Sequence, residues 1–232
     1  MKLSFLSFIA LAILGSFSAS AQTADEIVNK YVAAMGGAEK LSSLQSVQMS
    51  GTISVQGNDF GIAITRMQNV GMRVDMDIMG SENYQVVNTK SGSQFMPVMG
   101  MQAPQPMEDD QYKTSRTQLD LQGLLFNYKS KGVSLETAGT ETVNGNAAQK
   151  LIATLQDGSK VNFFIDNKTG FVVKTSATRN IGGQQMNLET TLEDYRQTAE
   201  GYWFPYKTTN SQGTMNFDKV EANVKVDPAI FN

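Results

Sequence analysis

The sequence predicts a mainly β protein in which a strongly curved antiparallel sheet, or half-open barrel, is covered by helices. Apolar and polar residues alternate with a period of two over most of the chain from Ser46 onward, which is typical of strands with one buried face. Connectors rich in Gly and Asn, such as residues 144–146, separate these runs and indicate hairpins. Helical spacing is confined to the start and the middle of the chain. Together these features favour a curved sheet with helices on one side.

The chain begins with a segment typical of a secretory signal peptide. Met1-Lys2 is a short basic start, an apolar run interrupted only by Ser extends from Leu3 to Leu14, and Ala19-Ser20-Ala21 follows. This run is shorter than the roughly 20 residues of a membrane-spanning helix, and the A-x-A pattern is a cleavage site. We therefore expect cleavage after Ala21, with residues 1–21 removed, residues 22–232 forming a single domain, and localisation in the periplasm.

The first mature segment predicts a helix. Thr23 is followed three positions later by Glu26, the arrangement in which each side chain satisfies a free backbone N–H at a helix start. Gly36-Gly37 supplies the left-handed conformation that favours a helix end, and a shorter helix is expected over residues 38–44. The apolar residues at helical spacing are Ala24, Ile27, Val28, Tyr31 and Met35.

Strands are expected over most of the remaining chain. Their ranges are 46–56, 60–64, 72–78, 83–89, 132–143, 146–155, 161–165, 170–179, 186–196, 202–210 and 213–226. The segment from Phe95 to Met107, rich in Met and Pro, is interpreted as a loop. Leucines between Leu119 and Leu125 break the β period, so a helix is predicted midway along the chain, ending near Tyr128.

The composition excludes several function classes. The 232 residues contain no Cys and no His, which removes cysteine nucleophiles, imidazole bases, Ser-His-Asp triads, zinc sites and disulfides. Lys and Arg number 19 against 22 Asp and Glu and do not cluster, so nucleic acid is not an expected partner. We expect a monomer that is not an enzyme, with no catalytic residue, no metal and no cofactor.

Several segments, in this order after a signal peptide, resemble the LolA-type periplasmic lipoprotein carriers and their outer-membrane lipoprotein-sorting relatives. The segments are ADEIVNKYVAAMGGAEKL, SVQMSGTISV with the strand that follows it, VNGNAAQKLIATL, VNFFIDNKTGFVVKTSAT, GYWFPYK and VKVDPAIFN. The resemblance covers most of the mature chain. It implies a half-open antiparallel β-barrel closed by a lid of helices, as in LolA and LolB. It also implies a carrier that shields acyl chains of lipoproteins or lipids in an apolar cavity on their way to the outer membrane. The implied partners are an inner-membrane export complex and an outer-membrane acceptor.

One charged residue closes an apolar row on a predicted strand. Arg66 shares a strand face with Phe60, Ile62 and Ile64, and a charge facing a core is costly unless it is paired. In the carriers that the chain resembles, a strand-borne Arg at the matching place hydrogen-bonds to the backbone of the lid and holds the empty cavity shut. The resemblance implies this role for Arg66, or for Arg73 after a small shift in register. The alternative is that Arg66 snorkels to water at a strand end. The expected lining and rim of the cavity are Phe60, Ile62, Ile64, Arg66, Met72, Val74, Met76, Ile78, Met96 and Met99.

Methionine supports a second hypothesis. Eight of the 13 Met residues fall between Met67 and Met107, and their flexible side chains suit a surface for apolar chains of varied shape. The spacing of Met76 and Met79, and of Met96, Met99 and Met101, would also allow thioethers to bind Cu(I). A ligand-sensing or Cu(I)-binding envelope protein on the same scaffold is therefore the alternative function.

The carboxylates do not indicate catalysis. Asp75 and Asp77 share a strand face with Arg73, opposite an apolar row, which is typical of the solvated side of a half-buried strand. Residues 108–110 are interpreted as a solvated acidic loop, because they lack the alternating ligands of a calcium site.

Overall fold

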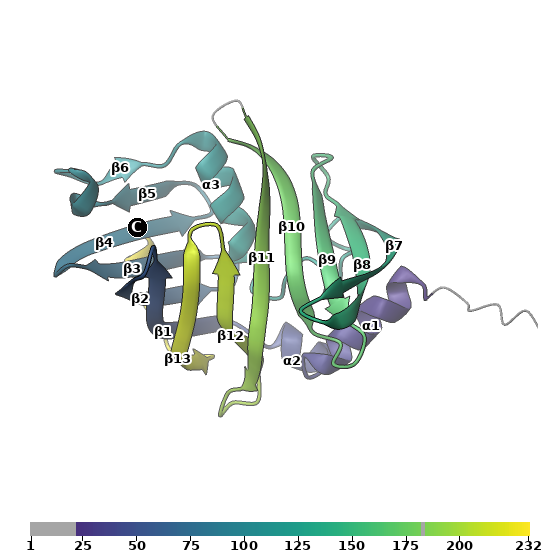
Figure 1. Ribbon diagram of the computed structural model, residues 1–232. Coiled ribbons are helices and arrows are strands. Elements are labelled where there is room, and N and C mark those ends of the chain that lie inside the picture. Colours follow the sequence, from purple (N-terminus) through teal and green to yellow (C-terminus); the bar gives the residue numbers. More distant parts are fainter. Residues whose placement is uncertain (1–21, 182–183) are drawn as a thin grey trace, which may run out of the picture.

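The computed structural model describes residues 22–181 and 184–232, so the predicted signal peptide lies outside the described residues. In this part of the chain thirteen strands form one antiparallel sheet in the order β6-β5-β4-β3-β2-β1-β13-β12-β11-β10-β9-β8-β7 (Figure 1). β6 and β7 are the two ends of this order, so the curved sheet is not closed into a barrel. The predicted fold class, a mainly β protein with a half-open curved sheet, is confirmed.

The strands alternate in direction along nearly the whole chain. The first six are β1 (Ser46–Val55), β2 (Asn58–Met67), β3 (Gly71–Ile78), β4 (Ser81–Asn88), β5 (Gly92–Phe95) and β6 (Gln105–Pro106). The others are β7 (Ser134–Val143), β8 (Asn146–Thr154), β9 (Lys160–Asp166), β10 (Val172–Ile181), β11 (Gln184–Gln197), β12 (Trp203–Asn210) and β13 (Gly213–Ala222). The last strand returns to pair with the first, which places β1 and β13 in the middle of the sheet.

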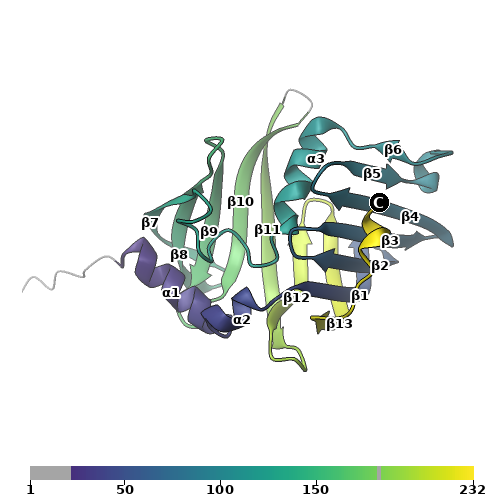
Figure 2. The same ribbon diagram turned by 180° about the vertical axis from the view of Figure 1, so that it is seen from behind.

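Helices cover the concave face of the sheet. They are α1 (Ala24–Ala34), α2 (Ala38–Ser42) and α3 (Asp109–Arg116), with short 3-10 helices η1 (Pro97–Met99), η2 (Thr117–Leu119) and η3 (Pro228–Phe231). Seen from behind, α1, α2 and α3 lie in front of the sheet, and an irregular segment connects α3 to β7 (Figure 2). We call residues 117–132, which comprise η2 and the turns after it, the strap. Among the described residues, none of the helices has both the length and the apolar character needed to cross a membrane.

The start of α1 has the predicted capping box. The Thr23 hydroxyl accepts from the Glu26 backbone N–H at 3.3 Å, and the Glu26 carboxylate accepts from the Thr23 N–H at 2.8 Å. At the other end Gly36 has φ of 100°, and the Gly37 N–H donates to the carbonyl of Val32 at 2.8 Å. These contacts fix both ends of the helix, so that Ile27, Val28 and Tyr31 can face the sheet.

Two apolar clusters fill the space between the sheet and its cover. The first comprises Val47, Met49, Ile62, Ile64, Met72, Val87, Met107, Leu119, Phe217 and Val220. The second comprises Ile27, Val28, Tyr31, Leu125, Leu151, Ile165 and Val172. The strap contributes Leu119 to one cluster and Leu125 to the other, so it joins the two halves of the core.

The predicted middle helix over Leu119–Tyr128 is wrong. The helix of this region is α3, which begins at Asp109, and the leucines lie in the 3-10 turn and the irregular turns of the strap. Gly123 and Asn127 have φ of 74° and 53°, so the chain bends and its apolar side chains reach two different clusters. A regular helix would have directed them along one stripe.

Two neighbouring expectations also need correction. The acidic residues 108–110 are exposed as expected, but Asp109 and Asp110 form the first turn of α3 and not a loop. Their negative charge is favourable there, because a helix N-terminus carries partial positive charge. The expected loop from Phe95 to Met107 contains η1 and the short edge strand β6, and the strand β5 before it was missed. Strands of two and four residues are too short to show a period.

The C-terminal turn packs against the convex face. Phe231 in η3 is 1% exposed, and a Cβ added at Gly71 would lie 2.3 Å from the Phe231 ring. The Asn88 side-chain amide donates to the Phe231 carbonyl at 2.8 Å. Only Gly at position 71 therefore leaves room for the ring between β3 and the chain end.

We predict that Phe231→Ala destabilises the protein by about 3 to 5 kcal/mol, because it empties a closely packed apolar site. Urea unfolding followed by circular dichroism measures the change. Ile230→Ala, which truncates the half-buried neighbour, is the matched control and should cost less. An equal loss in both variants would show that the Phe231 site is not specifically packed.

Candidate functional site

The candidate site is the apolar concave face of β2 and β3 beneath the strap. Strand pairing places Ile62 opposite Met76, Ile64 opposite Val74, and Arg66 opposite Met72. Alternation places Phe60 and Ile78 farther along the same face, where both are half-buried. The residues of the expected lining that pack into the first cluster are Ile62, Ile64, Met72, Val74 and Met76. The structure thus brings the predicted β2 and β3 residues together as one surface.

The two expected rim methionines have different surroundings. Met96, directly after β5, is 8% exposed, whereas Met99 in η1 is 76% exposed. Met79, in the turn between β3 and β4, is 88% exposed. In an antiparallel meander the β3–β4 turn and the end of β5 lie at the same end of the sheet, so Met79 and Met99 belong to one rim (Figure 1). Met96 belongs to the core and not to this rim.

Arg66 lies at the covered end of the concave face. Its Nη2 lies 3.5 Å from the side-chain oxygen of Gln118 in η2, and its buried Nε has no hydrogen-bond partner among the described residues. Burial disfavours the charged form and lowers the pKa of the guanidinium. Arg66 therefore contacts the strap through a side-chain amide and not through the expected backbone carbonyls. This contact satisfies only some of the hydrogen-bond donors of the guanidinium.

The strap is instead held to the sheet by the residues that follow β2. The Gln68 side chain donates to Asp120 Oδ1 at 3.1 Å and accepts from the Leu121 N–H at 2.5 Å. Next to it, the Asn69 N–H donates to the Leu119 carbonyl at 2.9 Å. We call Gln68 and Asn69, together with Leu119, Asp120 and Leu121, the clasp; it was not predicted from the sequence. A Gln after the end of a strand does not indicate, in the sequence, a hydrogen-bond partner about 50 positions away.

The strap is also attached to α1. The Tyr128 hydroxyl donates to Asp25 Oδ1 at 2.6 Å, and the Lys129 ammonium lies 2.8 Å from Asp25 Oδ2. These hydrogen bonds, first from Lys129 and then from Tyr128, lower the pKa of Asp25. The charge-dependent part of this attachment is therefore present at neutral pH and is lost as the pH falls through that lowered pKa. The strap is therefore held both by its buried leucines and by polar contacts at its surface.

Arg73 occupies the opposite face of the sheet. It forms an ion pair with Asp75 at 2.7 Å, and its guanidinium lies 4.5 Å from the centre of the Tyr84 ring. The observed register thus excludes Arg73 as an alternative to Arg66 at the lid. The interpretation of Arg73 and Asp75 as the solvated side of β3 agrees with this arrangement.

A second polar atom is left without a partner on the concave side. Thr208 of β12 pairs with Met215 and Leu192, which pack into the first and second clusters respectively. Its buried hydroxyl has no hydrogen-bond partner among the described residues. An unpaired buried hydroxyl is unfavourable, so a ligand that offered a hydrogen bond here would gain affinity.

Solved structures with the same architecture identify the fold. A LolA superfamily protein from Nitrosomonas europaea matches with a TM-score of 0.57 and 13% identity, over 91% of this chain and 98% of that chain. The fold is LolA-like. An outer membrane lipoprotein-sorting protein domain from Vibrio parahaemolyticus matches with a TM-score of 0.55 and 14% identity, over 89% of this chain and 95% of that one. A DUF1329 family protein from Desulfovibrio piger matches with a TM-score of 0.57 and 10% identity, over 91% and 98% of the two chains.

These comparisons confirm the LolA-like resemblance at the level of fold. A scan against protein-family models found no match, and a search of curated proteins found none either. At identities of 10 to 14% these structures establish a shared architecture alone.

We predict that Gln68→Leu loosens the strap of the LolA-like fold. Leu has a similar length and removes two hydrogen bonds, each worth about 0.5 to 1.5 kcal/mol, so opening should become several-fold to about a hundredfold more frequent. Hydrogen exchange of the strap amides, followed by mass spectrometry, measures this. Gln48→Leu, on the convex face of β1, is the matched control. Equal exchange in both variants would rule out the clasp.

Proposed function

We propose that the protein is a periplasmic carrier that binds acyl chains of lipoproteins or lipids on its concave face and transports them toward the outer membrane. On this proposal residues 1–21 are a signal peptide cleaved after Ala21, and the single domain 22–232 shuttles as a monomer. It receives cargo from an inner-membrane export complex and delivers it to an outer-membrane acceptor. Its work is binding and release, not catalysis.

The observation that carries the proposal is the contrast between the strap and what lies beneath it. The face under the strap is lined by aliphatic, Met and Phe side chains from β1, β2, β3, β4 and β13. Besides its buried Leu119 and Leu125, the strap is attached to β2, α1 and α2 by side-chain hydrogen bonds, including one from Gln122 to the Ser42 carbonyl at 3.3 Å. Water can replace such bonds when the strap lifts, whereas an exposed apolar face needs a new cover. An acyl chain supplies that cover.

Arg66 suits a surface that is covered by the strap in the empty protein and by an acyl chain in the loaded protein. In the closed state its Nε is buried without an acceptor among the described residues, which disfavours closure. Acyl chains in lipids and lipoproteins end in ester or amide carbonyls, which accept hydrogen bonds from a guanidinium. Loading would therefore give Arg66 the partner that it lacks in the empty protein, while the clasp residues keep the empty state closed.

Native mass spectrometry of protein purified from the periplasm tests the function directly. A co-purifying diacylated lipid or lipopeptide is the expected result. Bound copper would instead support the Cu(I) alternative. A matched preparation of Gln68→Leu should carry more lipid, because its strap opens more readily. A protein that neither co-purifies with an amphiphile nor binds one added in detergent would contradict the proposal.

We predict that Arg66→Leu weakens binding of a diacyl ester lipid by about tenfold or more, because charge-assisted hydrogen bonds contribute about 1.5 to 3 kcal/mol. The free energy of unfolding of the empty protein should not fall, since the change also removes a poorly paired buried charge. Arg66→Lys should be intermediate, because Lys lacks the planar fork.

The measurement is equilibrium competition between the ester lipid and an apolar dye without carbonyl groups, together with transfer of labelled lipopeptide to acceptor membranes. Arg73→Leu, on the convex face, is the control. If Arg66→Leu and Arg73→Leu bind and transfer alike, Arg66 has no role in cargo binding.

A further inference from the structure

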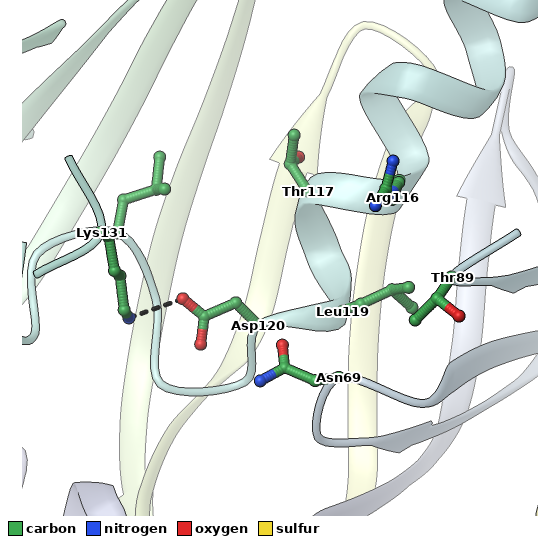
Figure 3. A pocket seen from close by; sticks show the side chains of 8 residues that line it. Asn69, Thr89, Arg116, Thr117, Leu119, Asp120 and Lys131 are labelled. Atoms are coloured by element: carbon green, nitrogen blue, oxygen red, sulfur yellow. Dashed lines mark hydrogen bonds and ion pairs between the residues drawn. The ribbon is translucent and has the colours of Figure 1, made fainter. Parts of the chain in front are cut away.

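A pocket of about 310 Å³ lies where the strap leaves α3 and crosses two turns of the sheet. Its walls come from the β2–β3 turn, the β4–β5 turn, the end of α3 and both ends of the strap (Figure 3). The volume is at the lower end of the range for small-molecule sites, about 300 to 1,000 Å³. The lining residues are Asn69, Thr89, Arg116, Thr117, Leu119, Asp120, Leu124 and Lys131.

One side of the pocket is formed by an ion pair between Lys131 and Asp120, whose charges cancel. Lys131 Nζ lies 2.6 Å from Asp120 Oδ2 and donates to the Gly123 carbonyl at 2.7 Å. The two side chains are only 24% and 21% exposed, so solvent does not readily separate them. The carboxylate of Asp120 is thus already neutralised, and it also accepts from Gln68.

The other side carries an uncompensated positive charge. Arg116, in the last turn of α3, lines the pocket and has no hydrogen bond or ion pair among the described residues. Figure 3 shows its side chain on the opposite side of the pocket from Lys131, with the Asp120 carboxylate between them. The pocket therefore has a net charge of about +1, and the side chains of Asn69, Thr89 and Thr117 offer neutral hydrogen bonds nearby.

The base of the pocket is continuous with the apolar core. Leu119 lines the pocket, yet it is 4% exposed and packs in the first cluster with Ile64 and Met72. A molecule bound here meets charge at its outer end and the edge of the core at its inner end. This change from a charged to an apolar surface fits an amphiphile, which has a polar and an apolar end, and does not fit a wholly polar metabolite.

We propose that this pocket binds the phosphate of a lipid headgroup, with Arg116 as its charge partner. The inference rests on the proposed function and narrows the cargo to a phospholipid whose acyl chains occupy the concave face. A guanidinium binds phosphate through two parallel hydrogen bonds. Arg116, which is unpaired within residues 22–181 and 184–232, is therefore better suited than the paired Lys131. The clasp residue Asp120 borders the pocket, so a headgroup bound there would lie against the fastening of the strap.

The test compares dioctanoylphosphatidic acid with dioctanoylglycerol, which have the same acyl chains and differ only in the phosphate group. The wild-type protein should bind the phospholipid about tenfold or more tightly, as expected for charge-assisted hydrogen bonds. Arg116→Gln should reduce this preference to about twofold or less. Lys113→Gln, which removes an exposed charge one turn earlier in α3 outside the lining, should keep it. Added salt should lower the preference in wild type.

The outcomes separate this inference from the proposed function. Equal affinity of the wild-type protein for the two lipids, or the same loss in Arg116→Gln and Lys113→Gln, would overturn the headgroup site and leave the carrier intact. Failure to bind either lipid would contradict the carrier itself. Tight binding of glycerol 3-phosphate without binding of the phospholipid would assign the pocket to a soluble phosphate compound and overturn the lipid assignment.

Discussion

The structure depends on covering the apolar concave face of its central strands. A thirteen-stranded sheet that does not close cannot bury that face against itself, so α1, α3 and the strap must supply the second layer. The strap covers both halves of this face, because one irregular segment contributes Leu119 to one cluster and Leu125 to the other. Removing the strap would expose both halves of the core at once. The contacts that hold the strap in place therefore determine whether the concave face is covered.

Besides these two leucines, the strap has polar attachments. Gln68 and Asp25 hold the strap through hydrogen bonds whose partners water can replace at modest cost, whereas the surface beneath is apolar. A cover held in this way can be lifted without breaking the sheet, whose strands remain joined by their own backbone ladders.

Two buried polar atoms on the concave side also reduce the stability of the closed protein. Arg66 Nε and Thr208 Oγ1 are buried without partners among the described residues, and each lowers the stability of the closed state. A protein selected for stability alone would have apolar side chains at both places. If the protein carries lipids as proposed, these two atoms are places where ester or amide groups of a bound lipid would gain hydrogen bonds.

The sequence by itself determined the period-two strands, the hairpin turns, the capped first helix and the shared face of Phe60, Ile62, Ile64 and Arg66, because all of these follow from spacing within about ten residues. It did not determine β5 and β6, which are too short to show a period, or the irregular strap, whose leucines mimic a helix. Only the tertiary structure decided that Gln68 fastens the strap, that Arg73 faces outward and that Arg116 has no partner in the described part of the chain, although it lines one pocket with Asp120. The reason is physical: a local pattern fixes which face a side chain takes, whereas its partner is fixed by how the chain returns from 50 or more residues away.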